Sequence, residues 1–383
     1  DAGQVCVSSA CIDPGDPCTD SFDCPADAFC EPTLDQCLPQ FDPVTCETTP
    51  VFGEFEPRLE WSVTSVTEAT DCLHPISTPA VVDLDGDLFP DVIVPCACDE
   101  DWQRGVLRAF RGDSGDELWA AVEPEDQVNG RSTVAAGDLD GDGTPEIVAA
   151  ALPDTGTLFA FSADGQKLWE SHDGALPHVM PLNNGAPTIA DLDGDGFSEI
   201  ICGATVLDST GQLVWERDSG PSEGTNLDYA GGISVVADID LDTLPEVVSG
   251  HHAYEHDGEP KWTATGGDGY PAVANFDLDP QPEIVIVSAG TVRYVDGVTG
   301  AVEWGPVSLP GGGRGGPPTV ADFDNDGNPE IGVAGAESYS VFDPDGPEDV
   351  LWSDETQDLS SNCTGSSVFD FEGDGAAEVV YAD

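Results

Sequence analysis

A nine-residue acidic pattern, D-x-D-x-D-G-x-x-[D/E], occurs seven times in this sequence and restricts its fold more than any other feature. The copies begin at Asp83, Asp138, Asp191, Asp238, Asn275, Asp322 and Asp370, and we number them loops 1 to 7. They follow one another at intervals of about 48 residues. A repeat of this length predicts one small supersecondary unit per copy, stacked against its neighbours.

Each copy lies between two short apolar stretches, such as STVAAG before loop 2 and EIVAAA after it. A second hairpin follows in six of the units and ends at a tryptophan: Trp119, Trp169, Trp215, Trp262, Trp304 and Trp352. Two hairpins make four antiparallel strands per unit, which is the composition of a propeller blade. The sequence therefore predicts an all-β, seven-bladed β-propeller.

The two ends of the repeat region are incomplete in complementary ways. Trp61 precedes the first acidic loop, whereas the last unit stops at EVVYAD, after its second strand. We expect residues 51–66 to supply the outer two strands of the blade whose inner strands lie within 366–383. N-terminal strands would thus complete the last blade and close the ring.

The acidic loop has the chemistry of a hard-cation site. Asp side chains at positions 1, 3 and 5 of a tight loop converge, and the acid at position 9 closes the cage; oxygen ligands in this number favour Ca²⁺ over Mg²⁺ and transition metals. Because the closing acid is at position 9 and not 12, the loop is not an EF-hand. It resembles the β-hairpin calcium loop of the FG-GAP/VCBS repeats found in integrin α-subunits and bacterial surface proteins.

This resemblance implies up to seven bound Ca²⁺ ions. The implied ligands are the residues at positions 1, 3, 5 and 9 of each loop: Asp83, Asp85, Asp87 and Asp91; Asp138, Asp140, Asp142 and Glu146; Asp191, Asp193, Asp195 and Glu199; Asp238, Asp240, Asp242 and Glu246; Asn275, Asp277, Asp279 and Glu283; Asp322, Asp324, Asp326 and Glu330; Asp370, Glu372, Asp374 and Glu378.

Position 6 of the loop, where a positive φ is expected, is Gly in four of the seven copies and Leu88, Thr243 or Pro280 in the other three. Loop 5, with Asn275 and Pro280, departs most from the pattern. We expect the metal to stiffen the hairpins and not to contact a ligand.

Charge and cysteine content restrict the environment and the partners. The chain has 75 acidic and 10 basic residues, a formal charge of −65, which disfavours nucleic acid and anionic membrane surfaces. No apolar run is long enough to insert in a membrane. Twelve cysteines without a zinc-type pattern indicate disulfides and a secreted or cell-surface protein. A start at Asp1 is expected if a signal peptide has been removed.

Residues 1–50 form a separate cysteine-rich arm in this interpretation, and residues 51–383 form the propeller. The arm contains seven cysteines: Cys6, Cys11, Cys18, Cys24, Cys30, Cys37 and Cys46. So short a segment needs disulfides to fold. The propeller contains five, all predicted at the strand ends opposite the acidic loops: Cys72, Cys96, Cys98, Cys202 and Cys363. Both numbers are odd, so if all twelve pair, at least one bridge joins the two regions.

The predicted function is that of a non-enzymatic binding or adhesion module that takes a protein or glycan at the face opposite the acidic loops. The candidate contact residues are Trp102, His178, Asn183, Asn184, Tyr229 and Arg314. One alternative is a structural surface protein that self-assembles or joins an extracellular assembly through its arm. Another is a lectin or carbohydrate-active enzyme on a calcium propeller, although no nucleophile–base motif is present.

Two further signals have simpler explanations in the sequence. Arg111-Gly112-Asp113 spells an integrin-recognition tripeptide, but it occupies a position where other units have turns such as ADG or STG. His251, His252 and His256 make a transition-metal site conceivable, yet ordinary loop histidines are the favoured interpretation.

Overall fold

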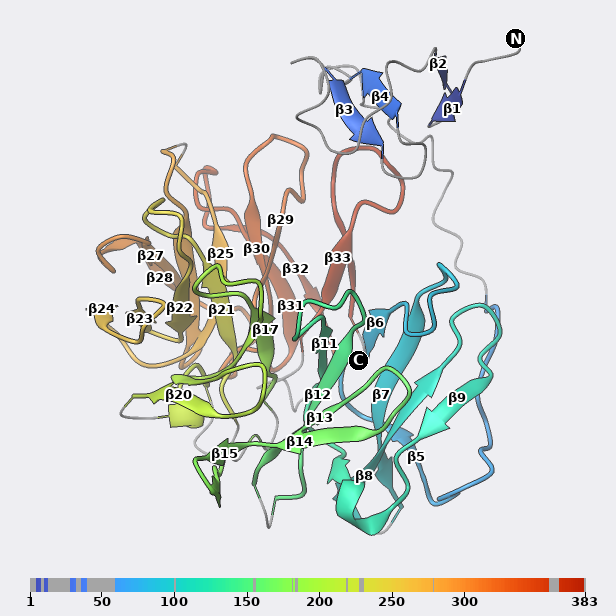
Figure 1. Ribbon diagram of the computed structural model, residues 1–383. Coiled ribbons are helices and arrows are strands. Elements are labelled where there is room, and N and C mark those ends of the chain that lie inside the picture. Colours follow the sequence, from blue (N-terminus) through green and yellow to red (C-terminus); the bar gives the residue numbers. More distant parts are fainter. Residues whose placement is uncertain are drawn as a thin grey trace. The chain divides into compact units, whose positions relative to one another are not determined.

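The structure is a computed structural model of the 383-residue chain (Figure 1). It describes residues 59–99, 101–153, 156–180, 182, 185–217, 220–226, 231–277, 279–357 and 365–381, together with the backbone of four short strands near the N-terminus. The chain divides into two compact units, Asp1–Glu54 and Phe55–Asp383. No helix in the described residues has the length and apolar character needed to cross a membrane.

The first unit contains two small hairpins. Strand β1 (Val5–Val7) pairs with β2 (Ala10–Ile12), and β3 (Ala28–Glu31) pairs with β4 (Gln36–Pro39), both antiparallel. The side chains of this unit lie outside the described residues. The predicted disulfides of the arm stay predictions.

The second unit is a succession of antiparallel sheets, each formed by strands consecutive in sequence (Figure 1). Sheet 1 contains β5 (Cys72–Pro75), β6 (Ala80–Val82), β7 (Asp91–Cys98), β8 (Asp101–Phe110), β9 (Glu117–Ala120) and β10 (Val128–Asn129). Sheet 2 contains β11 (Ala135–Gly137), β12 (Glu146–Ala150), β13 (Leu158–Phe161) and β14 (Lys167–Glu170). Sheet 3 contains β17 (Thr188–Ala190), β18 (Glu199–Cys202), β19 (Thr205–Leu207) and β20 (Leu213–Glu216).

The later sheets repeat the four-stranded order. Sheet 4 contains β21 (Ser234–Ala237), β22 (Glu246–Ser249), β23 (His252–Tyr254) and β24 (Pro260–Thr263). Sheet 5 contains β25 (Tyr270–Ala274), β26 (Glu283–Ser288), β27 (Thr291–Asp296) and β28 (Val302–Ser308). Sheet 6 contains β29 (Thr319–Ala321), β30 (Glu330–Ala334), β31 (Ser338–Phe342) and β32 (Val350–Glu355), and sheet 7 pairs β33 (Ser367–Phe369) with β34 (Glu378–Val380). Between sheets 2 and 3, β15 (His172–Asp173) pairs with β16 (Leu176–Pro177).

Successive sheets pack face to face. Their first strands lie in an unbroken series of neighbours from β6 through β11, β17, β21, β25 and β29 to β33. The second strands of sheets 1 to 6 are mostly buried on both faces, which explains why their sequences, such as EIVAA in β12 and EIVIVS in β26, are apolar without alternation. One apolar cluster lies between each consecutive pair of sheets. The prediction of an all-β repeat architecture is confirmed.

The tryptophan that ends each unit connects one sheet to the next. The indole Nε1 of Trp119, Trp169, Trp215 and Trp262 donates to a carbonyl in the second hairpin turn of the following sheet, at 2.7–3.1 Å. A glycine four residues before the next tryptophan lies against that indole. At Gly165, a Cβ would be 2.5 Å from the ring of Trp119. A larger residue at this turn would displace the indole of the preceding sheet.

Trp61 makes the same contact although it precedes the first sheet. Its Nε1 donates to the carbonyl of Gly112 at 2.7 Å, and Gly115 lies against its ring. Trp61 therefore occupies the place that the tryptophan of a sheet before sheet 1 would have. The predicted outer strands are only partly testable: residues 59–66 form no strand, which is contrary to the prediction, and residues 51–58 lie outside the described residues.

The cysteines follow the sequence prediction in part. Cys72 and Cys98 form a disulfide between β5 and β7, at the strand ends away from the acidic loops. Cys96 and Cys202 are free thiols and buried. The premise that all twelve cysteines pair is therefore wrong for these two, and Cys363 lies outside the described residues.

The packing of turn glycines against tryptophan predicts an unequal response to alanine. Gly165 and Gly174 both have positive φ, but a Cβ at Gly174 would meet nothing within 4 Å. Gly165→Ala should lower the free energy of unfolding by about 2 kcal/mol or more through overpacking, whereas Gly174→Ala should lower it by about 1 kcal/mol from backbone strain alone. Urea unfolding followed by tryptophan fluorescence measures both, and equal losses would contradict this account of the turn.

Candidate metal centres

The seven acidic loops connect the first two strands of the seven sheets, as the sequence predicts. Loop 1 joins β6 to β7, and loops 2 to 7 join β11 to β12, β17 to β18, β21 to β22, β25 to β26, β29 to β30 and β33 to β34. In sheet 1 the second hairpin turn lies at the same end, because Arg111 in that turn contacts loop 1. The β7–β8 connection and the disulfide lie at the opposite end.

A hydrogen bond between positions 2 and 9 closes every loop. The backbone amide of position 2 donates to the position-9 carboxylate at 2.6–3.0 Å in all seven loops. The apolar side chain of position 2, such as Leu139 or Ile239, is buried and anchors the loop in the core. The same anchor brings the closing acid under the loop, where Asp91, Glu246, Glu283 and Glu330 are almost fully buried.

Backbone amides also organise the carboxylates at positions 1 and 5. In loop 1, the amides of Gly86, Asp87 and Leu88 donate to Asp83 at 2.8–3.2 Å, and the hydrogen bond from Leu88 is the largest of the effects that lower the pKa of Asp83. The position-7 amide donates to the position-5 Asp at 2.7–3.0 Å in all seven loops. These bonds hold the acids in place before any cation binds.

The result is a cluster of carboxylates that repel one another. In loops 1 to 4, oxygens from positions 1, 3 and 9 lie within 4.8 Å of one another. Burial, followed by repulsion from neighbouring Asp side chains, raises the pKa of Glu199, Glu283 and Glu330 to about 7. The residues therefore fit a hard divalent cation, which would neutralise the repulsion and accept several oxygen ligands.

Positive φ angles at position 6 confirm the backbone prediction. Gly143, Gly196, Gly327 and Gly375 have φ between 86° and 97°, and the two substituted positions, Leu88 and Thr243, are held at 72° and 87°. In these six loops the position-6 amide donates to the position-1 Asp at 2.8–3.0 Å.

Loop 5 lacks this arrangement. Pro280 has no amide hydrogen and its ring excludes a positive φ. The first-position residue, Asn275, instead donates through its side-chain amide to the carbonyl of Asp279. Loop 5 is therefore the least suited to a cation, in agreement with its departure in sequence.

Loop 4 contains a cation of its own. The Nζ atom of Lys261, the residue before Trp262, lies 2.5 Å from Asp240, 3.2 Å from Glu246 and 3.0 Å from Glu255. The side chain of Lys261 is only 9 % exposed. The ammonium thus bridges positions 3 and 9 of the loop, where a metal ion would also bind.

Loop 1 has a second internal cation. Arg111 contacts Asp87 at 2.8 Å and also contacts Asp85, so its guanidinium spans positions 5 and 3. Arg111 belongs to the Arg-Gly-Asp tripeptide, which lies in a turn closed by two backbone hydrogen bonds. The amide of Arg111 donates to the carbonyl of Asp116, and the amide of Gly115 donates to the carbonyl of Arg111, both at 2.8 Å. The prediction that this tripeptide is a turn is confirmed. Loops 1 and 4, the two loops with an internal cation, are also those with Leu88 or Thr243 at position 6.

The predicted ligand-contact residues are only partly described. Asn183, Asn184 and Tyr229 lie outside the described residues. Trp102 is exposed on β8, His178 contacts Glu216 at 3.1 Å, and Arg314 donates to the carbonyl of Asn226 at 3.0 Å. Their separate contacts leave the prediction of a shared binding surface untested.

Two of the three histidines of sheet 4 lie side by side. The Nε2 atoms of His251 and His252 are 3.0 Å apart, and their Nδ1 atoms face Asp268 at 3.5 Å and Glu223 at 3.6 Å. His256 instead accepts the indole hydrogen of Trp215 through its backbone carbonyl.

Antiparallel four-stranded repeats with acidic hairpin loops define a β-propeller-like repeat protein. The repeats are of a known kind: the FG-GAP-like repeat matches residues 83–149, 138–202 and 275–333. The chain therefore contains FG-GAP-like repeats within a β-rich fold, as its loops led us to expect. Among curated proteins, none has a sequence that matches this chain.

Several solved structures share the fold at low sequence identity. The Vibrio cholerae biofilm matrix protein Bap1 superposes with a TM-score of 0.68 at 19 % identity, over 85 % of this chain and 80 % of Bap1. The Bacillus licheniformis rhamnogalacturonan lyase PL11 gives 0.57 at 17 % identity, over 84 % of this chain and 72 % of the lyase. The rhamnogalacturonan lyase YesW gives 0.53 at 18 % identity, over 80 % and 64 %. These similarities establish the fold alone.

The lysine in loop 4 leads to a prediction about the metal-free protein. In a chelator, Lys261→Met should lower the free energy of unfolding by about 3 kcal/mol, because three carboxylates lose their cation. Lys167→Met removes a more exposed lysine, paired with Asp126, and should cost about 1 kcal/mol or less.

Calcium distinguishes the two variants further. Added Ca²⁺ should restore most of the stability that Lys261→Met loses, because the emptied loop can then accept the ion, and it should not compensate Lys167→Met. Thermal unfolding with and without Ca²⁺ provides the measurement. A Lys261→Met protein as stable as the original in the chelator would show that the ammonium does not neutralise loop 4.

Proposed function

We propose that this protein is an extracellular calcium-binding β-propeller that acts as a non-enzymatic binding or adhesion module. The observation that supports calcium is the repeated cage, in which a buried position-9 acid and amide-held Asp side chains meet in one loop after another. Loops 2, 3, 6 and 7 combine the acids with Gly at position 6, and they are the sites that we assign to Ca²⁺. In loops 1 and 4, Arg111 and Lys261 take its place.

The disulfide between Cys72 and Cys98 supports an oxidising, extracellular location. The fold shared with a biofilm matrix protein is consistent with adhesion. Calcium in this proposal stabilises the scaffold, and the ligand is taken at the opposite strand ends, where the loops between sheets differ most in sequence.

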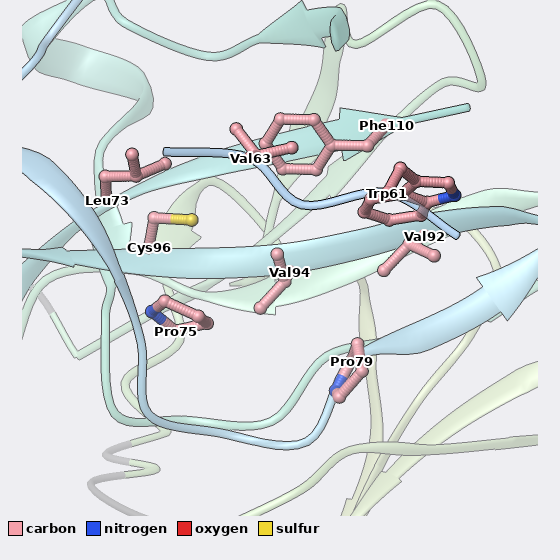
Figure 2. A pocket seen from close by; sticks show the side chains of 9 residues that line it. All are labelled: Trp61, Val63, Leu73, Pro75, Pro79, Val92, Val94, Cys96 and Phe110. Atoms are coloured by element: carbon pink, nitrogen blue, oxygen red, sulfur yellow. The ribbon is translucent and has the colours of Figure 1, made fainter. Parts of the chain in front are cut away.

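We further propose that the seven sheets form a closed ring of seven blades. The face of sheet 1 that is turned away from sheet 2 carries Val92, Val94 and Phe110, which line an apolar cavity of 350 Å³ (Figure 2). Trp61 lies over one part of this cavity, as Figure 2 shows. Corresponding faces of sheets 2 to 6 are covered by the preceding sheet.

Sheet 7 has a complementary apolar face. Val368 and Val379 pack against sheet 6, whereas the alternating residues Phe369 and Val380 are 58 % and 48 % exposed. Packing the open face of sheet 7 on that of sheet 1 would bury both, with Trp61 in the position of the last blade's tryptophan.

Ring closure predicts that Trp61 contributes as much stability as a tryptophan within the repeat. Trp61→Ala and Trp119→Ala should each lower the free energy of unfolding by about 3 kcal/mol or more, because each removes an indole packed on a turn glycine. Chemical unfolding measures both. A loss of less than about 1 kcal/mol for Trp61→Ala alone would mean that this segment does not close the ring.

Binding and catalysis are separated by direct assay. The calcium-loaded protein should be retained by a subset of immobilised glycans or surface proteins, and it should lose this retention when a chelator unfolds it. Polysaccharides incubated with the protein should stay uncleaved. The appearance of new chain ends in rhamnogalacturonan or another polysaccharide would favour the carbohydrate-active alternative. Retention by none of the immobilised ligands would contradict the binding proposal.

A further inference from the structure

Two sheets carry an arginine at the same structural position. Trp119 pairs with Ala109 in sheet 1, and Trp304 pairs with Tyr294 in sheet 5. The residues one step earlier in β8 and β27, Arg108 and Arg293, are therefore equivalent. Across the outer strand pair, Glu117 faces Phe110 in sheet 1, and Val302 faces Val295 in sheet 5. Val302 thus stands where sheet 1 has Glu117.

Arg108 shows what a buried guanidinium at this position requires. It is completely buried and forms an ion pair with Glu117. Its remaining N–H groups donate to the carbonyls of Cys72 at 3.2 Å, Glu68 at 2.8 Å and Ala69 at 3.0 Å. The charge is thereby neutralised by one carboxylate and solvated by backbone oxygens.

Arg293 lacks this environment. Only 4 % of it is exposed, and within the described residues the one hydrogen bond of its guanidinium runs from Nη2 to the carbonyl of Gly267 at 2.9 Å. Its Nε atom is buried without a partner, and no acid in the described residues lies within ion-pair distance. Burial lowers the pKa of Arg293, and Asp268 offsets this only in part. A buried cation without a counter-ion is costly, and such groups are concentrated at binding sites.

A cavity lies beside Arg293, with Val302 in its wall. The cavity has a volume of 290 Å³ and is also lined by Gly266, Gly267, Ser288, Thr291 and Pro306. These residues come from the β24–β25 loop, from the ends of β26 and β27 on either side of the turn that joins them, and from β28. The loop and the turn lie at the strand ends opposite the acidic loops, on the face where we expect the ligand.

The backbone around the guanidinium is shaped to leave it room. A Cβ at Gly266 would lie 2.7 Å from Cζ of Arg293, so only glycine allows the guanidinium to lie against this loop. The pairing of β27 with β28 shifts register between Val292 and Tyr294, which places Gly305 and Pro306 opposite Arg293. Such irregularities redirect side chains next to binding sites.

We propose that this cavity binds the carboxylate of a sugar-sized ligand, which takes the place beside Arg293 that Glu117 has beside Arg108. A guanidinium is matched to a carboxylate in geometry as well as in charge. The volume suits a single ring, and the hydroxyls of Ser288 and Thr291, the peptide groups of the glycines and the aliphatic Val302 and Pro306 suit sugar hydroxyls and C–H groups. The proposal rests on the binding function proposed above and names the ligand class.

The strongly negative charge of the protein does not prevent this. At physiological ionic strength, charges are screened over about 8 Å, and the acidic loops lie at the other ends of the strands. Asp268, held by the amides of Gly224 and Gly269, is the acid whose charge acts on Arg293.

Substitution of Val302 tests the proposal without removing the arginine. Val302→Glu recreates the pair of sheet 1 and fills the cavity with an internal carboxylate, and Val302→Gln is the neutral control of similar size. The three probes are galacturonate, galactose and a tripeptide with a free C-terminal carboxylate. Their binding to the full-length original protein and to both full-length variants is measured by ligand-observed NMR in Ca²⁺ and about 0.15 M salt.

We expect the original protein to bind galacturonate about tenfold more tightly than galactose or the peptide, since a charged hydrogen bond contributes about that factor. Val302→Glu should lose at least about tenfold in galacturonate affinity while remaining folded, with an unchanged or higher melting temperature. Val302→Gln should stay within about threefold of the original protein.

Three results would overturn the proposal: equal binding of galactose and galacturonate, unchanged galacturonate binding by Val302→Glu, or tighter binding of the peptide. Failure here is distinct from failure of the calcium scaffold, because the effect of chelation on melting is measured on the same samples. A protein that melts earlier in chelator but ignores galacturonate refutes the carboxylate pocket alone.

Discussion

The hydrogen bond from the position-2 amide to the position-9 carboxylate is the constraint on which the rest of this structure depends. It recurs in all seven acidic loops and joins an apolar anchor to the closing acid, and both are buried in most of the loops. The first strand, the loop and the second strand are thereby held as one unit. The same bond draws the acid toward the Asp side chains of the loop, where their mutual repulsion calls for a cation.

Contacts between sheets extend this local order over the second unit. Trp119, Trp169, Trp215 and Trp262 each donate to a carbonyl of the next sheet and pack on its turn glycine, so the position of one sheet constrains that of the next. The sheets differ from one another at positions outside these sheet-to-sheet contacts. Lys261 and Arg111 each place a side-chain cation against the carboxylates of one acidic loop, and Arg293 lies beside a cavity in sheet 5.

The local features were predictable from the sequence because they depend on residues close together in the chain. Spacing and residue type predicted the acidic hairpins, the positive φ at position 6 and the four strands of most units. The features that depend on contacts between distant residues were not. Lys261 stands beside Trp262 in sequence, and only the fold brings its ammonium to Asp240. The glycine four residues before most of the tryptophans was a visible signal for the sheet-to-sheet contact, but its partner lies in the preceding unit.

Pairing of cysteines was also beyond the sequence, since Cys96 and Cys98 are two residues apart on β7 and both are buried, yet only Cys98 lies opposite Cys72. Arg293 was overlooked because nothing in its neighbourhood in the chain indicates that its carboxylate partner is missing. That conclusion required the comparison with Arg108, whose partner Glu117 is replaced by Val302 in sheet 5.

The central claim is that divalent cations in the acidic loops hold the scaffold together, and a comparison of melting temperatures in Ca²⁺, in Mg²⁺ and in EDTA at equal ionic strength tests it most directly. Each filled site at a hundred times its dissociation constant should add about 2.7 kcal/mol. We therefore predict a melting temperature in Ca²⁺ higher by about 10 °C or more than in EDTA, with a smaller effect of Mg²⁺. The same melting temperature in all three conditions would contradict the account.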